Sequence, residues 1–224
     1  MELKIGNKII GKNNPTFIIA EMSANHGGKL ETALDIVRAA KRAGADAIKL
    51  QTYKADTITV NSDKKDFKIP SNSPWSSCKT LWNLYDMAYT PWEWHEIIFE
   101  EAKKLNLEIF SSPFDDTAVD LLEELNVPAY KIASPEITNI PLLHKVGSTG
   151  KPIILSSGIS NFDDLNLAIE TIRSTGNNNI AVLKCTSSYP APIEEANLLT
   201  IPSLSKRFNV LSGISDHTKG TVAA

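Results

Sequence analysis

The sequence predicts an α/β fold, a TIM-type (β/α)8 barrel that is incomplete because only seven of its strands can be found. Short apolar runs rich in β-branched residues alternate with segments of helical spacing, which is typical of a parallel sheet covered on both faces. Nearly every predicted strand ends in a polar side chain, as expected when all strand ends converge on one site. No Gly-x-Gly-x-x-Gly turn follows the first strand, which argues against an open dinucleotide-binding sheet.

The predicted elements begin with a hairpin over residues 3–10, which turns at Gly6-Asn7 and could close the bottom of the barrel. The apolar runs then predict strands at residues 16–22, 47–52, 108–113, 129–134, 152–158, 180–187 and 209–217. Between them, one apolar face at helical spacing predicts helices at residues 30–43, 93–105, 117–125 and 163–174, with weaker patterns at 140–146 and 196–208.

A long insertion, residues 53–91, separates the second strand from its helix. It carries Pro70, Pro74, Trp75 and Trp82 and has little periodicity. Loops of this length in compact domains are usually functional, so we expect a lid or a substrate wall at the catalytic face.

The composition narrows the class of protein. The 224 residues are 42% hydrophobic and 22% charged, which excludes disorder of the whole chain. With 23 basic and 26 acidic residues the net charge is −3, and no basic stripe is evident, so neither nucleic acid nor a membrane is an expected partner. Cys78 and Cys185 are too far apart for a zinc knuckle, and the N-terminus lacks the pattern of a signal peptide; we expect a cytoplasmic protein.

Two lysines within apolar strands, Lys49 and Lys131, are the most informative candidate site residues. A lysine is costly to bury unless it meets an anion or forms an imine. Hydroxyl groups stand at the ends of other strands, at Ser112, Ser134, Ser156 and Ser215. Together they would suit a small polyanion. Alternatively, the lysines point outward between helices and the serines only cap the following turns.

Two further candidates lie at strand ends. Glu21 stands where a general base would be needed, although it could equally pair with one of the lysines. His217 suits a metal ligand whose ring a nearby carboxylate orients, but a lone histidine in such a turn is more often structural. His26 could take part in chemistry or only shape the Gly27-Gly28 turn, and His95 and His144 are interpreted as ordinary helix residues.

The strand ends resemble the N-terminal barrel of the nonulosonic acid synthases, the sialic acid synthase family. The motifs that carry the resemblance are Glu21-Met22-Ser23-Ala24-Asn25-His26, Ile48-Lys49-Leu50-Gln51-Thr52, Tyr130-Lys131-Ile132-Ala133-Ser134, Tyr189-Pro190-Ala191-Pro192 and Ser215-Asp216-His217-Thr218. The first motif and Thr90-Pro91-Trp92-Glu93-Trp94-His95 are most similar to the pseudaminic acid branch of the family.

The resemblance implies condensation of phosphoenolpyruvate with the open-chain aldehyde of a 2,4-diacetamido-2,4,6-trideoxyhexose, giving a nine-carbon 2-keto acid and phosphate. It assigns Glu21 to the handling of the attacking water, His217 to a divalent metal (Mn²⁺ or Mg²⁺), and Glu136 and Tyr189 to the sugar. The residues that match the phosphoenolpyruvate-binding set are Lys49, Ser112, Lys131, Ser134, Ser156 and Ser215.

The chain also departs from the family pattern. Residues 1–224 match part of the barrel, without the eighth unit that bears a second metal histidine. They also lack the C-terminal antifreeze-like domain, whose arginine reaches the partner subunit and implies a homodimeric full-length enzyme. We therefore expect this chain alone to associate through its open sheet edge and to be inactive.

Three alternatives stay open at this point. The chemistry could be that of the neuraminate or legionaminate branch, whose members usually have Gly-Val-Asn-His where this chain has Ser23-Ala24-Asn25-His26. The barrel could instead be a Schiff-base aldolase acting through Lys131 or Lys49. It could also be an inactive remnant that at most binds phosphoenolpyruvate or a partner chain.

Overall fold

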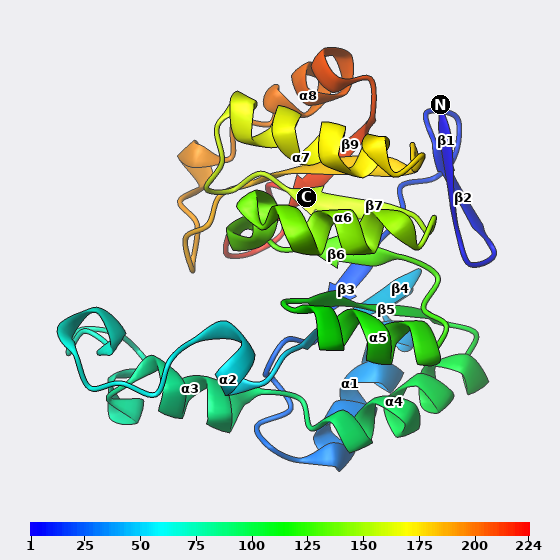
Figure 1. The fold of residues 1–224 in the computed structure, drawn as a ribbon. Coiled ribbons are helices and arrows are strands. Elements are labelled where there is room, and N and C mark those ends of the chain that lie inside the picture. Colours follow the sequence, from blue (N-terminus) through cyan, green and yellow to red (C-terminus); the bar gives the residue numbers. More distant parts are fainter. The chain divides into compact units, whose positions relative to one another are not determined.

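The computed structural model describes residues 1–224, which divide into two compact units, Phe17–Val127 and Met1–Thr16 with Pro128–Ala224 (Figure 1). The predicted hairpin is confirmed as β1 (Glu2–Ile5) paired antiparallel with β2 (Lys8–Gly11). Gly6 adopts a φ of 54° in its turn, a conformation that glycine takes without steric cost. Leu3 and Ile5 bury the apolar face of β1.

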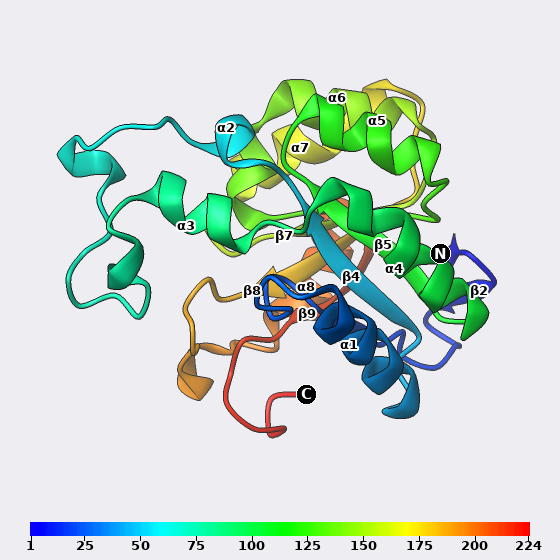
Figure 2. The ribbon, with the colours of Figure 1, turned by 90° about the horizontal axis from the view of Figure 1, so that it is seen from below.

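The unit Phe17–Val127 contains three parallel strands that are neighbours in chain order: β3 (Ile19–Glu21), β4 (Ala47–Thr52) and β5 (Glu108–Pro113). Helices α1 (Leu30–Arg42), α4 (Trp92–Lys104) and α5 (Asp116–Glu124) alternate with them, and α1 lies beside α4 (Figure 2). Val37 of α1 and Ile98 of α4 are fully buried with Ile48 of β4. This apolar core holds the strand ends in register.

The insertion after β4 has more regular structure than the sequence predicts. It contains α2 (Ala55–Ile58), the 3-10 turns η1 (Lys65–Phe67) and η2 (Ser76–Cys78), and α3 (Leu81–Ala88), which sequence periodicity missed. Thr80 caps α3 by accepting a hydrogen bond from the Asn83 amide at 3.3 Å. α3 has only eight residues and none of them is buried, so its helical signal is shorter than that of the helices predicted from the sequence.

The second unit contains four parallel strands, β6 (Tyr130–Ile132), β7 (Ile153–Ser156), β8 (Ile180–Cys185) and β9 (Leu211–Ser215), each paired with the next. Its helical elements are η3 (Ser134–Thr138), α6 (Ile140–Ser148), α7 (Phe162–Ser174), η4 (Ile193–Glu195) and α8 (Thr200–Phe208). Arg173 links α7 to the end of α8 by donating to the Phe208 carbonyl oxygen at 2.8 Å. The alternation of strands and helices continues through this unit.

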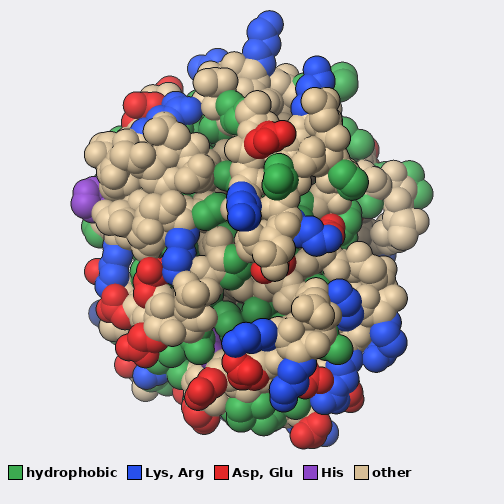
Figure 3. All heavy atoms as spheres, turned by 90° about the vertical axis from the view of Figure 1, so that its right-hand side faces the viewer, with side chains coloured by type: hydrophobic (Ala, Val, Ile, Leu, Met, Phe, Trp, Pro, Cys, Tyr) green, Lys and Arg blue, Asp and Glu red, His purple; other side chains and the backbone are tan.

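The predicted strands and helices are all present, and the α/β fold class with seven parallel strands is confirmed. Several strands are shorter than predicted: β3 has three residues and β7 ends at Ser156 because the following residues turn toward the next helix. No helix is both long enough and apolar enough to cross a bilayer. On the face shown in Figure 3, acidic and basic side chains are interspersed.

A buried polar chain links α4 to β4 and β5. The Thr52 hydroxyl lies 2.9 Å from His95 Nε2 and 2.6 Å from the Ser111 hydroxyl, and His95 Nδ1 lies 3.2 Å from the Pro91 carbonyl oxygen. Since a carbonyl oxygen only accepts, Nδ1 carries the proton and Nε2 accepts from Thr52. Burial lowers the pKa of His95 to about 4, so the ring is neutral near pH 7.

This histidine predicts a pH dependence of stability. Its pKa in the folded protein, about 4, is below the unfolded value of 6.5. The contribution of neutral His95 to the free energy of unfolding is therefore fully present above pH 6.5. It is lost as the pH falls toward 4, because in that range the unfolded chain binds a proton and the folded chain does not. At pH 4.5 we expect the wild type to lose about 2 to 3 kcal/mol more than His95→Gln, relative to pH 7, in urea denaturation. Equal losses in both proteins would contradict this role of His95.

Candidate functional site

The first group of candidate residues, the Lys49 cluster, comprises Glu21, Ser23, Lys49 and Ser112. Lys49 is 8% exposed, and its ammonium forms an ion pair with Glu21 Oε2. It also donates to Ser112 Oγ at 3.4 Å. The parallel register places Glu21 directly opposite Lys49, which explains their contact. Lys49 therefore does not point into water between helices, and the outward-facing interpretation is wrong for it.

The second group, the Lys131 cluster, comprises Lys131, Ser134, Ser156 and Gly158. Lys131 is 6% exposed, and its ammonium donates to Ser156 Oγ at 2.5 Å and to the Ile132 carbonyl oxygen at 3.0 Å. Ser134 Oγ accepts the Gly158 amide proton at 3.0 Å. The outward-facing interpretation is therefore also wrong for Lys131. Each strand-embedded lysine meets the hydroxyl of a predicted site serine, and each pair is buried.

Gly158 belongs to this cluster although the sequence analysis did not single it out as a site residue. A Cβ atom there would lie 2.1 Å from Ser187 Oγ and 2.9 Å from both Cys185 Sγ and Ser134 Oγ. Three side chains thus approach the backbone at this point, and only glycine leaves room for them. No local sequence signal distinguishes this glycine from a turn glycine, because the requirement arises from residues distant in the chain.

We expect Gly158→Ala to destabilise the protein by about 1 to 3 kcal/mol, the usual range for overpacking, because two hydroxyls and a thiol must move. The matched control is Gly213→Ala, whose Cβ would meet only the end of the flexible Leu183 side chain at 3.1 Å. Urea denaturation of both variants measures the difference. If Gly158→Ala lowers the free energy of unfolding no more than Gly213→Ala does, the side chains around Gly158 are not tightly packed.

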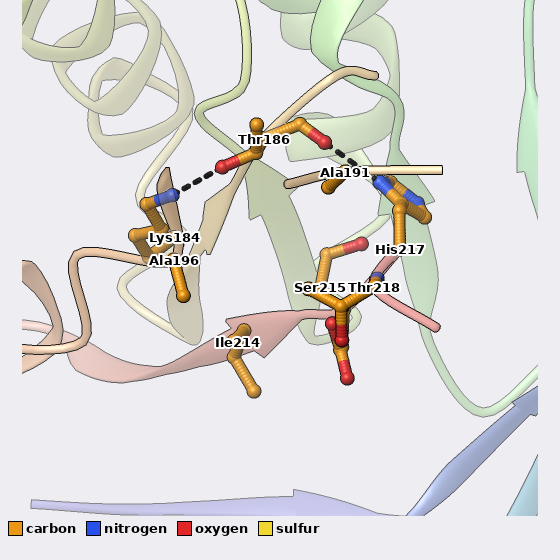
Figure 4. Close-up of a pocket in the computed structure, with 9 residues that line it drawn as sticks. Lys184, Thr186, Ala191, Ala196, Ile214, Ser215, His217 and Thr218 are labelled. Carbon is orange, nitrogen blue, oxygen red and sulfur yellow. Dashed lines mark hydrogen bonds between the residues drawn. The ribbon is translucent and has the colours of Figure 1, made fainter. Parts of the chain in front are cut away.

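His217 follows β9 and is oriented by the backbone. Its Nδ1 lies 3.0 Å from the Thr186 carbonyl oxygen, so Nδ1 carries the proton and the lone pair is on Nε2 (Figure 4). The carboxylate next in sequence is engaged elsewhere, since Asp216 Oδ1 accepts the Thr218 amide proton at 2.9 Å. A carbonyl oxygen serves as well as a carboxylate in orienting a metal-binding imidazole.

Cys185, at the end of β8, lies against the same histidine. Its Sγ is 3.9 Å from His217 Nδ1 and 3.7 Å from Ser187 Oγ. Although burial raises the pKa of this thiol, hydrogen bonds with His217, Ser134 and Ser187 outweigh that effect and lower it to about 7. The chemistry of this position was not predicted from the sequence, since it depends on neighbours from three elements.

A small pocket of about 10 Å³, room for about one water molecule, opens beside these residues within the second unit (Figure 4). Its lining includes the predicted residues Ser215 and His217, together with Lys184 and Thr186, which were not predicted. Lys184 is buried and donates to Thr186 Oγ1 and, at 2.8 Å, to the Glu195 carbonyl oxygen. Through these two hydrogen bonds Lys184 contacts both ends of the loop 186–195, which carries Tyr189.

The two residues expected to face the sugar lie outside that lining. Tyr189 is 68% exposed, and its ring centroid lies 4.4 Å from that of His217. Glu136 is a half-buried residue of η3, and its Oε2 accepts a hydrogen bond from Asn139 Nδ2 at 3.0 Å. Both side chains are thus accessible to a ligand from solvent.

The described chain does not complete a metal site. It contains no group of three or more His, Cys, Asp or Glu side chains placed to hold an ion. His26 and His95 are buried in hydrogen bonds to Thr90 and Thr52. His217 has the tautomer that a ligand needs, but a single imidazole is a weak ligand set for a divalent ion. The residues present therefore do not by themselves fit the expected metal.

Comparison with known proteins places these residues in a family. The model of the NeuB family matches residues 36–224. The chain is 49% identical over 208 residues to the pseudaminic acid synthase of Helicobacter pylori, covering 93% of this chain and 61% of that protein. It is 45% identical over 221 residues to the pseudaminic acid synthase of Campylobacter jejuni, covering 99% and 63%. The chain thus spans somewhat less than two thirds of the length of these curated relatives.

Solved structures show the same fold. The N-acetylneuraminic acid synthetase of Leptospira borgpetersenii, in complex with citrate, matches 98% of this chain and 71% of its own with a TM-score of 0.86 at 34% identity. The spore coat polysaccharide biosynthesis protein SpsE of Bacillus subtilis matches 98% and 57% with a TM-score of 0.81 at 36% identity. These relatives are TIM-type barrels, which confirms the predicted fold class.

Proposed function

The chain belongs to the NeuB family, and from that premise we propose that the protein containing it condenses phosphoenolpyruvate with a 2,4-diacetamido-2,4,6-trideoxyhexose to make pseudaminic acid. The observation that carries the proposal is the pair of buried lysine–serine contacts, Lys49 with Ser112 and Lys131 with Ser156. A buried ammonium beside a hydroxyl is a donor set for a carboxylate or a phosphate group. The reaction is assigned to the complete protein, because this chain spans 61% and 63% of the relatives named above.

Each cluster contributes donors to phosphoenolpyruvate in this proposal. Lys131 offers an ammonium that now contacts Ser156 Oγ and the Ile132 carbonyl oxygen. Lys49 offers one that is paired with Glu21 and Ser112. At Lys49 an anionic ligand must share the ammonium with the Glu21 carboxylate.

The chemistry follows from the substrates. The C3 carbon of phosphoenolpyruvate attacks the aldehyde carbon, forming the new C–C bond while the aldehyde oxygen takes up a proton. Water adds to C2 and loses a proton to Glu21. The tetrahedral intermediate then expels phosphate by breaking the C2–O bond, and the C2 hydroxyl proton passes to the departing phosphate, which leaves the 2-keto acid. A carboxylate suits this role because general bases act by accepting a proton from water at hydrogen-bond distance. The 43% exposure of the Glu21 side chain supports access of water to it.

A divalent ion, Mn²⁺ or Mg²⁺, is part of the proposal for the complete protein only. His217 is the residue of this chain that would contribute a ligand, through Nε2. Such an ion would polarise the aldehyde oxygen. No step above is assigned to it, since the ligands present here are insufficient. The homodimer and the cytoplasmic location expected from the sequence also stay predictions, which sedimentation and cell fractionation would test.

The test of the function is an assay with phosphoenolpyruvate, the sugar and Mn²⁺, which follows phosphate release and the mass of the nine-carbon product. We expect product from the 2,4-diacetamido-2,4,6-trideoxyhexose with the stereochemistry of the pseudaminic acid branch. Faster turnover with the amino-sugar precursor of neuraminic or of legionaminic acid would assign the protein to another branch. Trapping of a substrate on Lys131 or Lys49 by borohydride would favour the Schiff-base alternative instead.

A further inference from the structure

The turn that follows β3, residues 22–29, is fixed by buried contacts. The Met22 amide donates to the Lys49 carbonyl oxygen at 2.9 Å, and the Met22 side chain is fully buried. The Asn25 amide and its Nδ2 both donate to the Met22 carbonyl oxygen, at 3.1 and 2.8 Å. The start of the turn is therefore anchored on β4, beside Lys49.

His26 fixes the other part of the same turn. Its Nδ1 accepts the Gly28 amide proton at 3.1 Å, so Nε2 carries the proton and donates to Thr90 Oγ1 at 3.2 Å. The ring packs edge-on against Trp94 with the centroids 5.6 Å apart, and its burial lowers the pKa of His26. His26 thus shapes the turn rather than presenting a nitrogen to solvent.

These anchors hold Ser23 in an unfavourable backbone conformation. Its φ is 47°, in the left-handed region that glycine enters freely and that residues with a Cβ atom mostly avoid. Glycine would satisfy the backbone of this turn at lower conformational energy. Unlike glycine, serine brings to this position a hydroxyl that can donate a hydrogen bond.

What it contributes is a second hydrogen bond to the carboxylate of Glu21. The Ser23 amide and the Ser23 hydroxyl both donate to Glu21 Oε1, each at 3.0 Å. The other oxygen, Oε2, is paired with the Lys49 ammonium. Both oxygens are therefore held, on one side by the turn and on the other by β4, although the Glu21 side chain is partly open to water. These contacts hold the Glu21 carboxylate in one orientation.

We propose that Ser23 is a positioning residue that orients the Glu21 carboxylate for proton transfer. The inference rests on the proposed function, in which Glu21 accepts a proton from the attacking water. Ser23 touches neither substrate in this proposal and acts only through Glu21. Its left-handed conformation aims both of its donors at the same oxygen, so that loss of the hydroxyl alone loosens the carboxylate.

Two variants separate this role from a structural one. Ser23→Gly keeps the amide donor and relieves the backbone, whereas Ser23→Ala loses the same hydroxyl and keeps the Cβ atom. We expect both to lower kcat about tenfold in the complete protein, the scale of one hydrogen bond to a charged group, with the KM for phosphoenolpyruvate changed less than about threefold. Ser23→Gly should unfold at the same temperature as the wild type or higher.

The control for backbone relief is Asn126→Gly, because Asn126 has a φ of 52° in the turn after α5 and lies outside both clusters. It should match the thermal effect of Ser23→Gly and leave kcat unchanged. In a Glu21→Gln background, Ser23→Gly should lower kcat no further, since the carboxylate it orients is gone. Wild-type kcat in Ser23→Gly, or losses that multiply in the double variant, would overturn the proposal.

A crystal structure of Ser23→Gly tests the positioning role of Ser23 without requiring that the protein be active. If the wild-type protein forms no product, the proposed function fails, but the positioning role still predicts that the Glu21 carboxylate changes rotamer or becomes disordered in Ser23→Gly. An unchanged, well-ordered Glu21–Lys49 pair in that structure would show that the Ser23 hydroxyl is not needed to orient the carboxylate.

Discussion

Replacing Glu21 with glutamine is expected to lower turnover by about a hundredfold or more, the usual scale of a lost general acid–base group. Glutamine keeps the size and one carbonyl oxygen, which can still accept the donors of Ser23. It cannot take a proton from water near pH 7. Steady-state kinetics with phosphoenolpyruvate and sugar measures the loss, which should appear in kcat and not in KM for the sugar.

The same substitution should leave phosphoenolpyruvate binding intact or strengthen it. In the wild type, Glu21 neutralises the Lys49 ammonium through their ion pair. Without that negative charge Lys49 becomes a better partner for an anion. Glu31→Gln, in the first turn of α1, removes an acidic charge away from the Lys49 cluster and serves as the control. If Glu21→Gln turns over at a near-normal rate, activation of water must be assigned to another group.

The sequence predicted best those features that depend on local pattern. The bounds of β4 and β5 agree with the prediction, since each is a short segment with apolar residues at its centre that stands between segments of helical spacing. Lys49 and Lys131 were identified because a cation in an apolar strand is unusual wherever the strand lies. Their serine partners were predicted as a set, but the pairing of Lys49 with Ser112 and of Lys131 with Ser156 required the register of the strands.

The features that were missed arise from contacts between distant residues. The need for glycine at position 158 comes from Ser134, Cys185 and Ser187, which no local pattern links to it. The orientation of His217 by the Thr186 carbonyl oxygen depends on the path of the backbone, which a carboxylate next in sequence cannot reveal. The burial of His95 depends on where α4 packs against β4 and β5. Such constraints are visible only when the fold is known.

The second large effect is expected at Lys131. Its ammonium is buried and donates to the Ser156 hydroxyl and the Ile132 carbonyl oxygen. Lys131→Ala should weaken phosphoenolpyruvate binding by about 2 kcal/mol or more, roughly thirtyfold, because a bound anion would lose its charge-assisted hydrogen bonds. Lys49→Ala should also weaken binding by about 2 kcal/mol or more, for the same reason.

Calorimetric titration of the complete protein with phosphoenolpyruvate alone measures both affinities without requiring turnover. Lys131→Met is the matched variant, since it retains most of the apolar stem and removes the charge, so a loss shared with Lys131→Ala is electrostatic and not a cavity effect. Lys206→Ala on the exposed surface of α8 controls for the change in net charge. If Lys131→Met binds phosphoenolpyruvate as tightly as the wild type does, Lys131 is not a ligand of that substrate, and its burial beside Ser156 is structural.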